Sequence, residues 1–244
     1  MKNIIYIILV ACMVTPVTGQ NSGISVTGGI GSFDMSELKS YQEQLTSRLP
    51  VEARGFNFFP NYTCIRINLF RQSSEKVRYG LSYGYSTTGA HSNYIDYSGI
   101  LNLDQIITSY QLGVSGAYRL LQMNLSRTTL EMMAYGDLRL GLVRDEVQMN
   151  ITTDYYYESS RMILNAFTPV AEAGFDAMFR FTKVSLGISG GYLYDTGTRF
   201  KEGNSSSLNQ TVSLRPTEEL HSGLSGFRAG LKLILWFNNN PFIE

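Results

Sequence analysis

Apolar and polar residues alternate with a period of two over most of the chain, which is typical of β-strands with two chemically different faces. The alternation is clearest in residues 77–86, where Leu81 and Tyr83 are flanked by Gly80, Ser82 and Gly84. Seven further segments show it: residues 24–33, 62–70, 109–120, 130–142, 167–180, 184–195 and 227–237. The pattern predicts an all-β protein with eight antiparallel strands.

The segments between the predicted strands differ sharply in length. Residues 71–76, 121–126 and 181–183 are short turns, whereas residues 34–61, 88–105, 145–160 and 196–222 form long polar loops. Membrane β-barrels combine short periplasmic turns with long extracellular loops. Pro169 falls within the sixth predicted strand. Since proline donates no hydrogen bond to a ladder, we expect a bulge there or a strand that starts after it.

The two faces of the strands distinguish a soluble barrel from a membrane barrel, because the apolar face points inward in the first and outward in the second. Here the polar face carries charges of both signs together with Gly and Ser, which suits a narrow interior. We therefore expect Leu140 and Leu231 to face lipid, and Ser82 and Gly141 to face the interior. The predicted fold is an eight-stranded antiparallel up-and-down transmembrane β-barrel.

One helix is predicted in the first long loop, over residues 34–49. Asp34 is a suitable cap, Glu37 can complete a capping box, and Pro50 follows the segment. Its apolar residues fall at helical spacing: Leu38, Tyr41, Leu45 and Leu49. The helix is either a lid or partner-binding element, or a segment that packs its apolar stripe on the barrel rim.

The amino terminus has the pattern of a secretory signal peptide. Lys2 precedes an apolar stretch over residues 4–14, and small or neutral residues lead to a cleavage site after Gly19. The stretch is too short to cross the bilayer as a helix, which needs about 20 residues. We expect residues 1–19 to be removed and residues 20–244 to form the barrel. The alternative is lipidation at Cys12, because residues 9–12 resemble a lipobox.

Composition excludes several functions. Lys and Arg number 20 and Asp and Glu number 20, so the basic surplus of a nucleic-acid-binding protein is missing. After cleavage Cys64 is the single cysteine, which excludes an intramolecular disulfide. His91 and His221 do not stand at the spacing of metal ligands. We expect no metal and no cofactor.

Charged residues on the polar face form the main candidate site. The candidate interior charges are Glu131, Asp137, Arg139, Glu172, Asp176, Arg180, Arg228 and Lys232. They could line a conduit for small solutes, or form ion pairs that plug the barrel. The second interpretation is favoured, because the interior of an eight-stranded barrel is only wide enough for its own side chains and desolvated charges must pair.

Two further constellations are weaker. Tyrosines cluster in residues 92–97 and 153–158, where they could bind an extracellular ligand or simply extend strands beyond the membrane. His221, Ser222, Ser189 and Asp195 could be drawn as a catalytic set. No strand places a serine and a histidine two residues apart on one face, so we do not expect an enzyme.

Short Gly-aromatic stretches resemble the small outer-membrane β-barrel proteins of Bacteroidota, of the outer-membrane protein A or protein W type. They are residues 29–35, Glu37-Leu38, residues 97–99 and residues 226–231. The resemblance implies an eight-stranded outer-membrane barrel of a Gram-negative bacterium and carries no functional residue across. One departure is that Phe237 is followed by seven more residues, whereas the last strand of such proteins usually ends the chain on an aromatic residue.

The resulting functional expectation is a non-enzymatic outer-membrane barrel with a structural or surface-interaction role. A narrow, porin-like pore or small-solute facilitator is the alternative, and a lipid-modifying enzyme comes third. The expected partners are outer-membrane lipid, the barrel-assembly machinery during biogenesis, and an extracellular ligand at the long loops. The protein is expected to be a monomer.

Overall fold

The computed structural model describes residues 22–47, 54–56, 59–97, 99–126, 128–208, 214, 216 and 219–237. The signal peptide expected at residues 1–19 and the alternative lipidation site at Cys12 lie outside these ranges. The described elements are β1 (Ser22–Gly31), α2 (Ser36–Ser47), β2 (Arg54–Phe56), β3 (Tyr62–Gln72), β4 (Val77–Asp96), β5 (Gly99–Asn124), β6 (Thr129–Thr152), β7 (Tyr157–Arg180), β8 (Val184–Asp195), β9 (Lys201–Leu208) and β10 (Gly226–Trp236).

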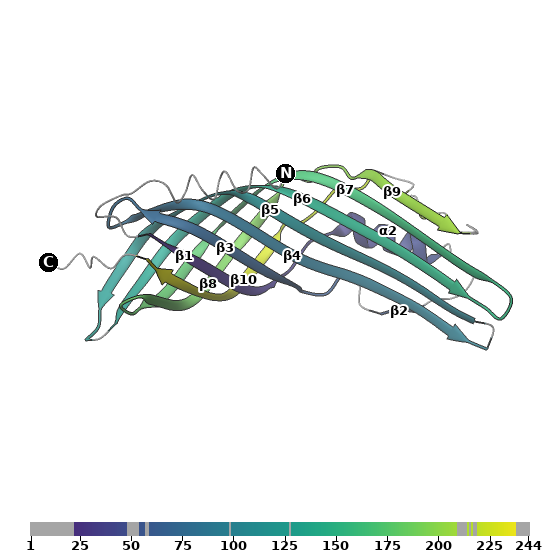
Figure 1. The fold of residues 1–244 in the computed structure, drawn as a ribbon, viewed down its shortest axis with the longest axis horizontal. Helices are drawn as coiled ribbons and strands as arrows, with labels where there is room; N and C mark the ends of the chain where they lie inside the picture. The colour runs from purple at the N-terminus through teal and green to yellow at the C-terminus, as the bar shows by residue number, and fades with distance from the viewer. Residues whose placement is uncertain are drawn as a thin grey trace.

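Eight of these strands close into an antiparallel ring (Figure 1). The order around the ring is β1, β3, β4, β5, β6, β7, β8 and β10, and β10 returns to β1 in a register that runs from Gly23–Trp236 to Gly31–Arg228. Each strand of the ring pairs with the next ring strand along the chain. The predicted eight-stranded antiparallel up-and-down barrel is therefore confirmed.

The barrel wall is apolar outside and polar inside, as the alternation predicts. Leu140 and Leu231 expose 53% and 73% of their surface, whereas Ser82 is fully buried in the interior. We call the exposed apolar side chains of the ring the apolar belt. Its large members include Tyr83, Tyr110, Leu112, Val114, Leu138, Leu140, Leu142, Phe167, Phe175, Leu186, Ile188, Phe227 and Leu231.

Four strands of the ring are about twice as long as the other four. β4, β5, β6 and β7 have 20, 26, 24 and 24 residues, whereas β1, β3, β8 and β10 have 10, 11, 12 and 11. We call their continuation beyond the ring, residues 87–96, 99–108, 144–152 and 157–165, the sheet extension. β2 pairs with β4 along one of its edges and β9 pairs with β7 along the other (Figure 1). The loops predicted at residues 88–105 and 145–160 are wrong, because most of these residues continue the two hairpins.

The two faces exchange their character where the sheet extension begins. On β6, Leu140 and Leu142 point outward within the ring, whereas Val147 and Met149 are fully buried on the inner face of the extension. Arg144 stands on the outer face beyond Leu142. On β6 the extension thus has a largely apolar inner face and a polar outer face, the reverse of the barrel, whereas Ile100 and Ile106 of β5 remain exposed on the outer face.

α2 covers this apolar inner face. Leu38, Tyr41 and Leu45 are buried in one cluster with inward residues of the extension and with Val170 and Leu193 of the adjoining ring end, so the predicted apolar stripe is confirmed for these three residues. Leu49, the fourth predicted residue of the stripe, lies outside the described ranges. The Tyr41 hydroxyl donates a hydrogen bond to the carbonyl of Leu214. The Glu37 carboxylate accepts a hydrogen bond from the backbone N–H of His221 at 2.9 Å instead of completing a capping box.

Pro169 stands in β7 without a bulge, in register with Leu140 of β6, so the expected irregularity is wrong. Its carbonyl faces the other neighbour and accepts a hydrogen bond from the Thr196 N–H at 3.3 Å. The pairing with β8 begins one residue later, at Val170, and the pairing with β9 ends at Asn165. Pro169 therefore occupies a gap in the ladder, where no N–H donor is needed.

Candidate functional site

The interior charges meet on Glu172, which projects inward from β7 and is 4% exposed. Arg66 Nη1 lies 2.7 Å from Glu172 Oε1, and Arg228 Nη1 lies 3.1 Å from Oε2. Arg139 also forms a direct ion pair with Oε2. Three guanidinium groups from β3, β6 and β10 thus converge on one carboxylate.

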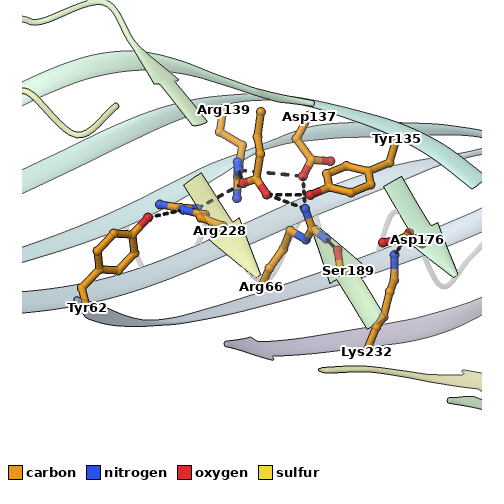
Figure 2. A network of polar contacts seen from close by, with 10 residues as sticks. Tyr62, Arg66, Tyr135, Asp137, Arg139, Asp176, Ser189, Arg228 and Lys232 are labelled. Carbon is orange, nitrogen blue, oxygen red and sulfur yellow. Dashed lines mark hydrogen bonds and ion pairs between the residues drawn. The ribbon is translucent and has the colours of Figure 1, made fainter. Parts of the chain in front are cut away.

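Neighbouring groups complete this central cluster. Asp137 Oδ2 lies 3.4 Å from Arg66 Nη1 and 3.8 Å from Arg139 Nη2. The Tyr135 hydroxyl donates to Glu172 Oε1 at 3.1 Å, and the Arg66 guanidinium stacks 4.1 Å from the centre of the Tyr135 ring. Arg66 donates a hydrogen bond to the Ser189 hydroxyl and Arg228 donates one to the Tyr62 hydroxyl, as Figure 2 shows. The charges are therefore held by hydrogen bonds as well as by Coulomb attraction, as burial requires.

A second group lies toward the short turns. Glu131 on β6 receives Arg78 at 2.5 Å, Arg119 at 3.1 Å and Arg180 at 3.5 Å. The single tryptophan, Trp236, stacks with this group, since the guanidinium carbon of Arg180 lies 4.1 Å from its ring centre. Between the two groups, Lys232 Nζ pairs with Asp176 Oδ2 at 2.6 Å.

All eight candidate interior charges therefore lie inside the ring, and each takes part in at least one ion pair. Arg66, Arg78 and Arg119 are interior charges that the candidate set does not contain. Period-2 alternation places all three on polar faces, so a signal exists in the sequence. Spacing along one strand cannot show that Arg66 of β3 contacts Glu172 of β7, because that contact depends on closure of the ring.

The interior leaves little open space. Phe70, Arg78, Met133, Asp176 and Lys232 border a cavity of about 30 Å³, which holds about two water molecules. Met133, Met178, Ile234 and Trp236 form a small apolar cluster at the end with the short turns. Side chains thus fill the barrel as expected for eight strands.

The sheet extension contains a separate buried acid, Asp145 on β6. It lies beyond the apolar belt, because the outward neighbours Arg144 and Glu146 are charged and partly exposed. Burial in the apolar core raises the pKa of Asp145 from 3.8 to about 7, and the hydrogen bond that Gln105 Nε2 donates to Oδ2 at 2.8 Å acts in the opposite direction.

The residues of the possible catalytic set do not come together. His221 Nδ1 lies 2.9 Å from Glu37 Oε2, and Ser189 binds Arg66. Asp195 accepts a hydrogen bond from the backbone N–H of Leu224 at 2.9 Å. Within the described ranges, three or more His, Cys, Asp and Glu side chains nowhere gather as metal ligands would.

The tyrosine clusters are divided between strand and turn. Tyr94 belongs to β4, where it packs against the core of the extension, whereas Tyr97 and Tyr155 are almost fully exposed at the tips of the β4–β5 and β6–β7 hairpins. The strand interpretation thus holds for Tyr94, whereas ligand binding by Tyr97 and Tyr155 stays a prediction.

Comparison with known proteins gives similar structures at low identity. No family model matches the sequence, and no curated protein matches it either. The attachment invasion locus protein Ail of Yersinia pestis, solved with the heparin analogue sucrose octasulfate, is 11% identical, with a TM-score of 0.40 over 90% of this chain and 100% of that chain. A major outer membrane protein of Thermus thermophilus is 11% identical, with a TM-score of 0.45 over 88% and 99%. The fold assignment therefore rests on the strand pairing.

Proposed function

We propose that the protein is a non-enzymatic barrel of the bacterial outer membrane that presents the sheet extension at the cell surface. The closed ring supports this proposal, because closure satisfies the backbone hydrogen bonds that hydrocarbon cannot satisfy. The apolar belt supports it as well, since a soluble barrel would place these side chains inside. The resemblance to small outer-membrane barrels of Bacteroidota points the same way.

The reversal of faces, which is clearest on β6, carries the proposal of a surface role. Outside the membrane the solvent is water on both sides, so the strands can continue only if their apolar face turns inward and is covered. α2 supplies the cover with Leu38, Tyr41 and Leu45. The short turns lie at the end of the barrel opposite the extension. The start of β1 and the end of β10 lie at the same end, where the Phe237 N–H donates to the Ser22 carbonyl at 2.9 Å. This orientation puts the extension outside the cell, available to an extracellular ligand.

The filled interior supports a structural or surface-interaction role over transport. The ion pairs of Arg66, Arg139 and Arg228 with Glu172 cross the lumen from three strands. A solute would have to displace them, and breaking a buried pair costs about 3–5 kcal/mol.

Two measurements test the proposal. The folded protein should fractionate with the outer membrane and migrate faster unboiled than boiled on a denaturing gel, because a closed ladder resists detergent until heated. In planar bilayers it should give no reproducible single-channel steps. Recovery as a soluble protein without heat-dependent mobility would refute the membrane assignment, and reproducible conductance steps would replace the plugged barrel with a narrow pore.

A further inference from the structure

Basic side chains of β6 and β9 stand just beyond the apolar belt, on either side of β7. Leu142 and Phe167 are the last exposed apolar residues of β6 and β7 before the sheet extension. The next outward positions are Arg144 and Asn165, which are register partners, and Asn165 pairs in turn with Lys201 of β9. Adjacent strands are about 4.8 Å apart, so Arg144 and Lys201 stand about 10 Å apart in one row.

A shared carboxylate holds two arginines of this surface in place. Arg144 Nη2 lies 2.9 Å from Glu146 Oε2, and Arg161 Nη2 lies 2.6 Å from Oε1. The two arginine side chains remain 43% and 47% exposed, so part of each guanidinium fork is available to a ligand. The neighbouring Glu202 is also exposed, but its register partner Leu164 points inward, so the Glu202 side chain leaves β9 on the inner face of the extension.

The resulting charge is localised. On the outer face of β6, β7 and β9, Arg144, Arg161 and Lys201 outnumber Glu146 by two charges, and on the neighbouring β5 the carboxylate of Asp104 contacts His91. At the level of Arg144 the outer-face residues of the neighbouring strands are uncharged. They are the successive register partners Thr108 on β5, Thr87 on β4 and Thr63 on β3. A general attraction to the membrane surface does not require this asymmetry, whereas a discrete binding site does.

We call Arg144 and Lys201, with Arg161 beside them, the basic row. We propose that the basic row binds a phosphate group on the headgroup sugar of an outer-leaflet glycolipid. The proposal rests on the proposed membrane location, which puts the row at headgroup height with the acyl chains against Leu142 and Phe167. Guanidinium groups bind phosphate through paired, charge-assisted hydrogen bonds, and Lys201 adds a second cation at a span suited to a sugar phosphate. Glu146 is a positioning residue that orients both arginines.

The test uses the full mature chain folded in nonionic detergent micelles. Diphosphorylated lipid A, its dephosphorylated form or inorganic phosphate is added, and the temperature at which half of the protein loses its compact gel form is recorded. We expect diphosphorylated lipid A alone to raise this temperature. The double variant R144Q/K201Q should bind it at least about tenfold more weakly, because two of the three cations are removed. The control K76Q/K183Q removes two exposed charges from the short turns and should bind it normally.

Each other result overturns the proposal in a distinct way. An equal effect of both lipids would mean that acyl chains and not phosphate are recognised. An equal response of both double variants would place the site elsewhere, and a response to inorganic phosphate would identify a free anion as the ligand. Absence of any compact, heat-sensitive form would instead refute the barrel proposal itself.

Discussion

Replacement of Asp145 by asparagine should stabilise the sheet extension at neutral pH. Asp145 is completely buried among apolar side chains and accepts one hydrogen bond from Gln105. Asparagine has nearly the same shape, retains an oxygen that accepts this bond, and carries no charge to desolvate. The variant therefore removes the cost of burying a carboxylate while leaving the packing beneath α2 unchanged.

The magnitude follows from the pKa of Asp145, which burial raises from 3.8 to about 7. Below pH 4 the carboxyl is protonated in both the closed and the opened extension, so pH has no effect. Between pH 4 and 7 the opened state loses its proton while the closed state keeps it, and stability falls. The total loss is about 4 kcal/mol, since each pKa unit corresponds to ~1.4 kcal/mol. Above pH 7 the stability should stay at this lower value.

Hydrogen exchange measured by mass spectrometry on peptides that cover residues 143–150 gives the free energy of opening. In the native protein it should fall between pH 4 and 7 after correction for intrinsic exchange rates. In D145N this fall should disappear. The control D154N removes an exposed carboxylate at the tip of the same hairpin and should keep the native pH dependence. A free energy of opening that rises with pH, or a slope that persists in D145N, would refute the reasoning.

Three further predictions concern the wall, the interior and the helix. L140R should destabilise the protein in lipid vesicles by about 2–4 kcal/mol in a urea titration, because Arg must enter hydrocarbon, whereas Q148R on the same face of β6 above the apolar belt should change stability by less than ~1 kcal/mol. E172Q should cost about 3–5 kcal/mol in the same titration by leaving three buried arginines without their shared carboxylate, whereas E146Q removes two partly exposed pairs worth about 0–1 kcal/mol each. L38A should cost about 2–5 kcal/mol in the extension, seen as faster exchange in residues 143–150, without loss of the heat-dependent mobility of the barrel. Equal effects of the paired variants, or loss of the barrel form in L38A, would contradict the assignments.

Local pattern determined the barrel itself. Alternation in residues 130–142 predicted that Leu140 faces outward and Gly141 inward, and both do, because the period of a strand leaves no other arrangement once one face lines the closed interior. The helical spacing of Leu38, Tyr41 and Leu45 likewise predicted a helix with one buried stripe. These properties depend on neighbours along the chain, which a sequence displays directly.

Tertiary structure decided where the strands end and which charges meet. The alternation of β6 changes phase at Leu142-Val143, and a change of phase resembles the start of a loop until α2 is seen to cover the second apolar face. The cluster of ion pairs around Glu172 also depends on tertiary contacts. Arg66 lies more than a hundred positions earlier in the chain and reaches Glu172 only across the closed ring. Both features arise from contacts between elements distant in sequence, and local periodicity carries no record of such contacts.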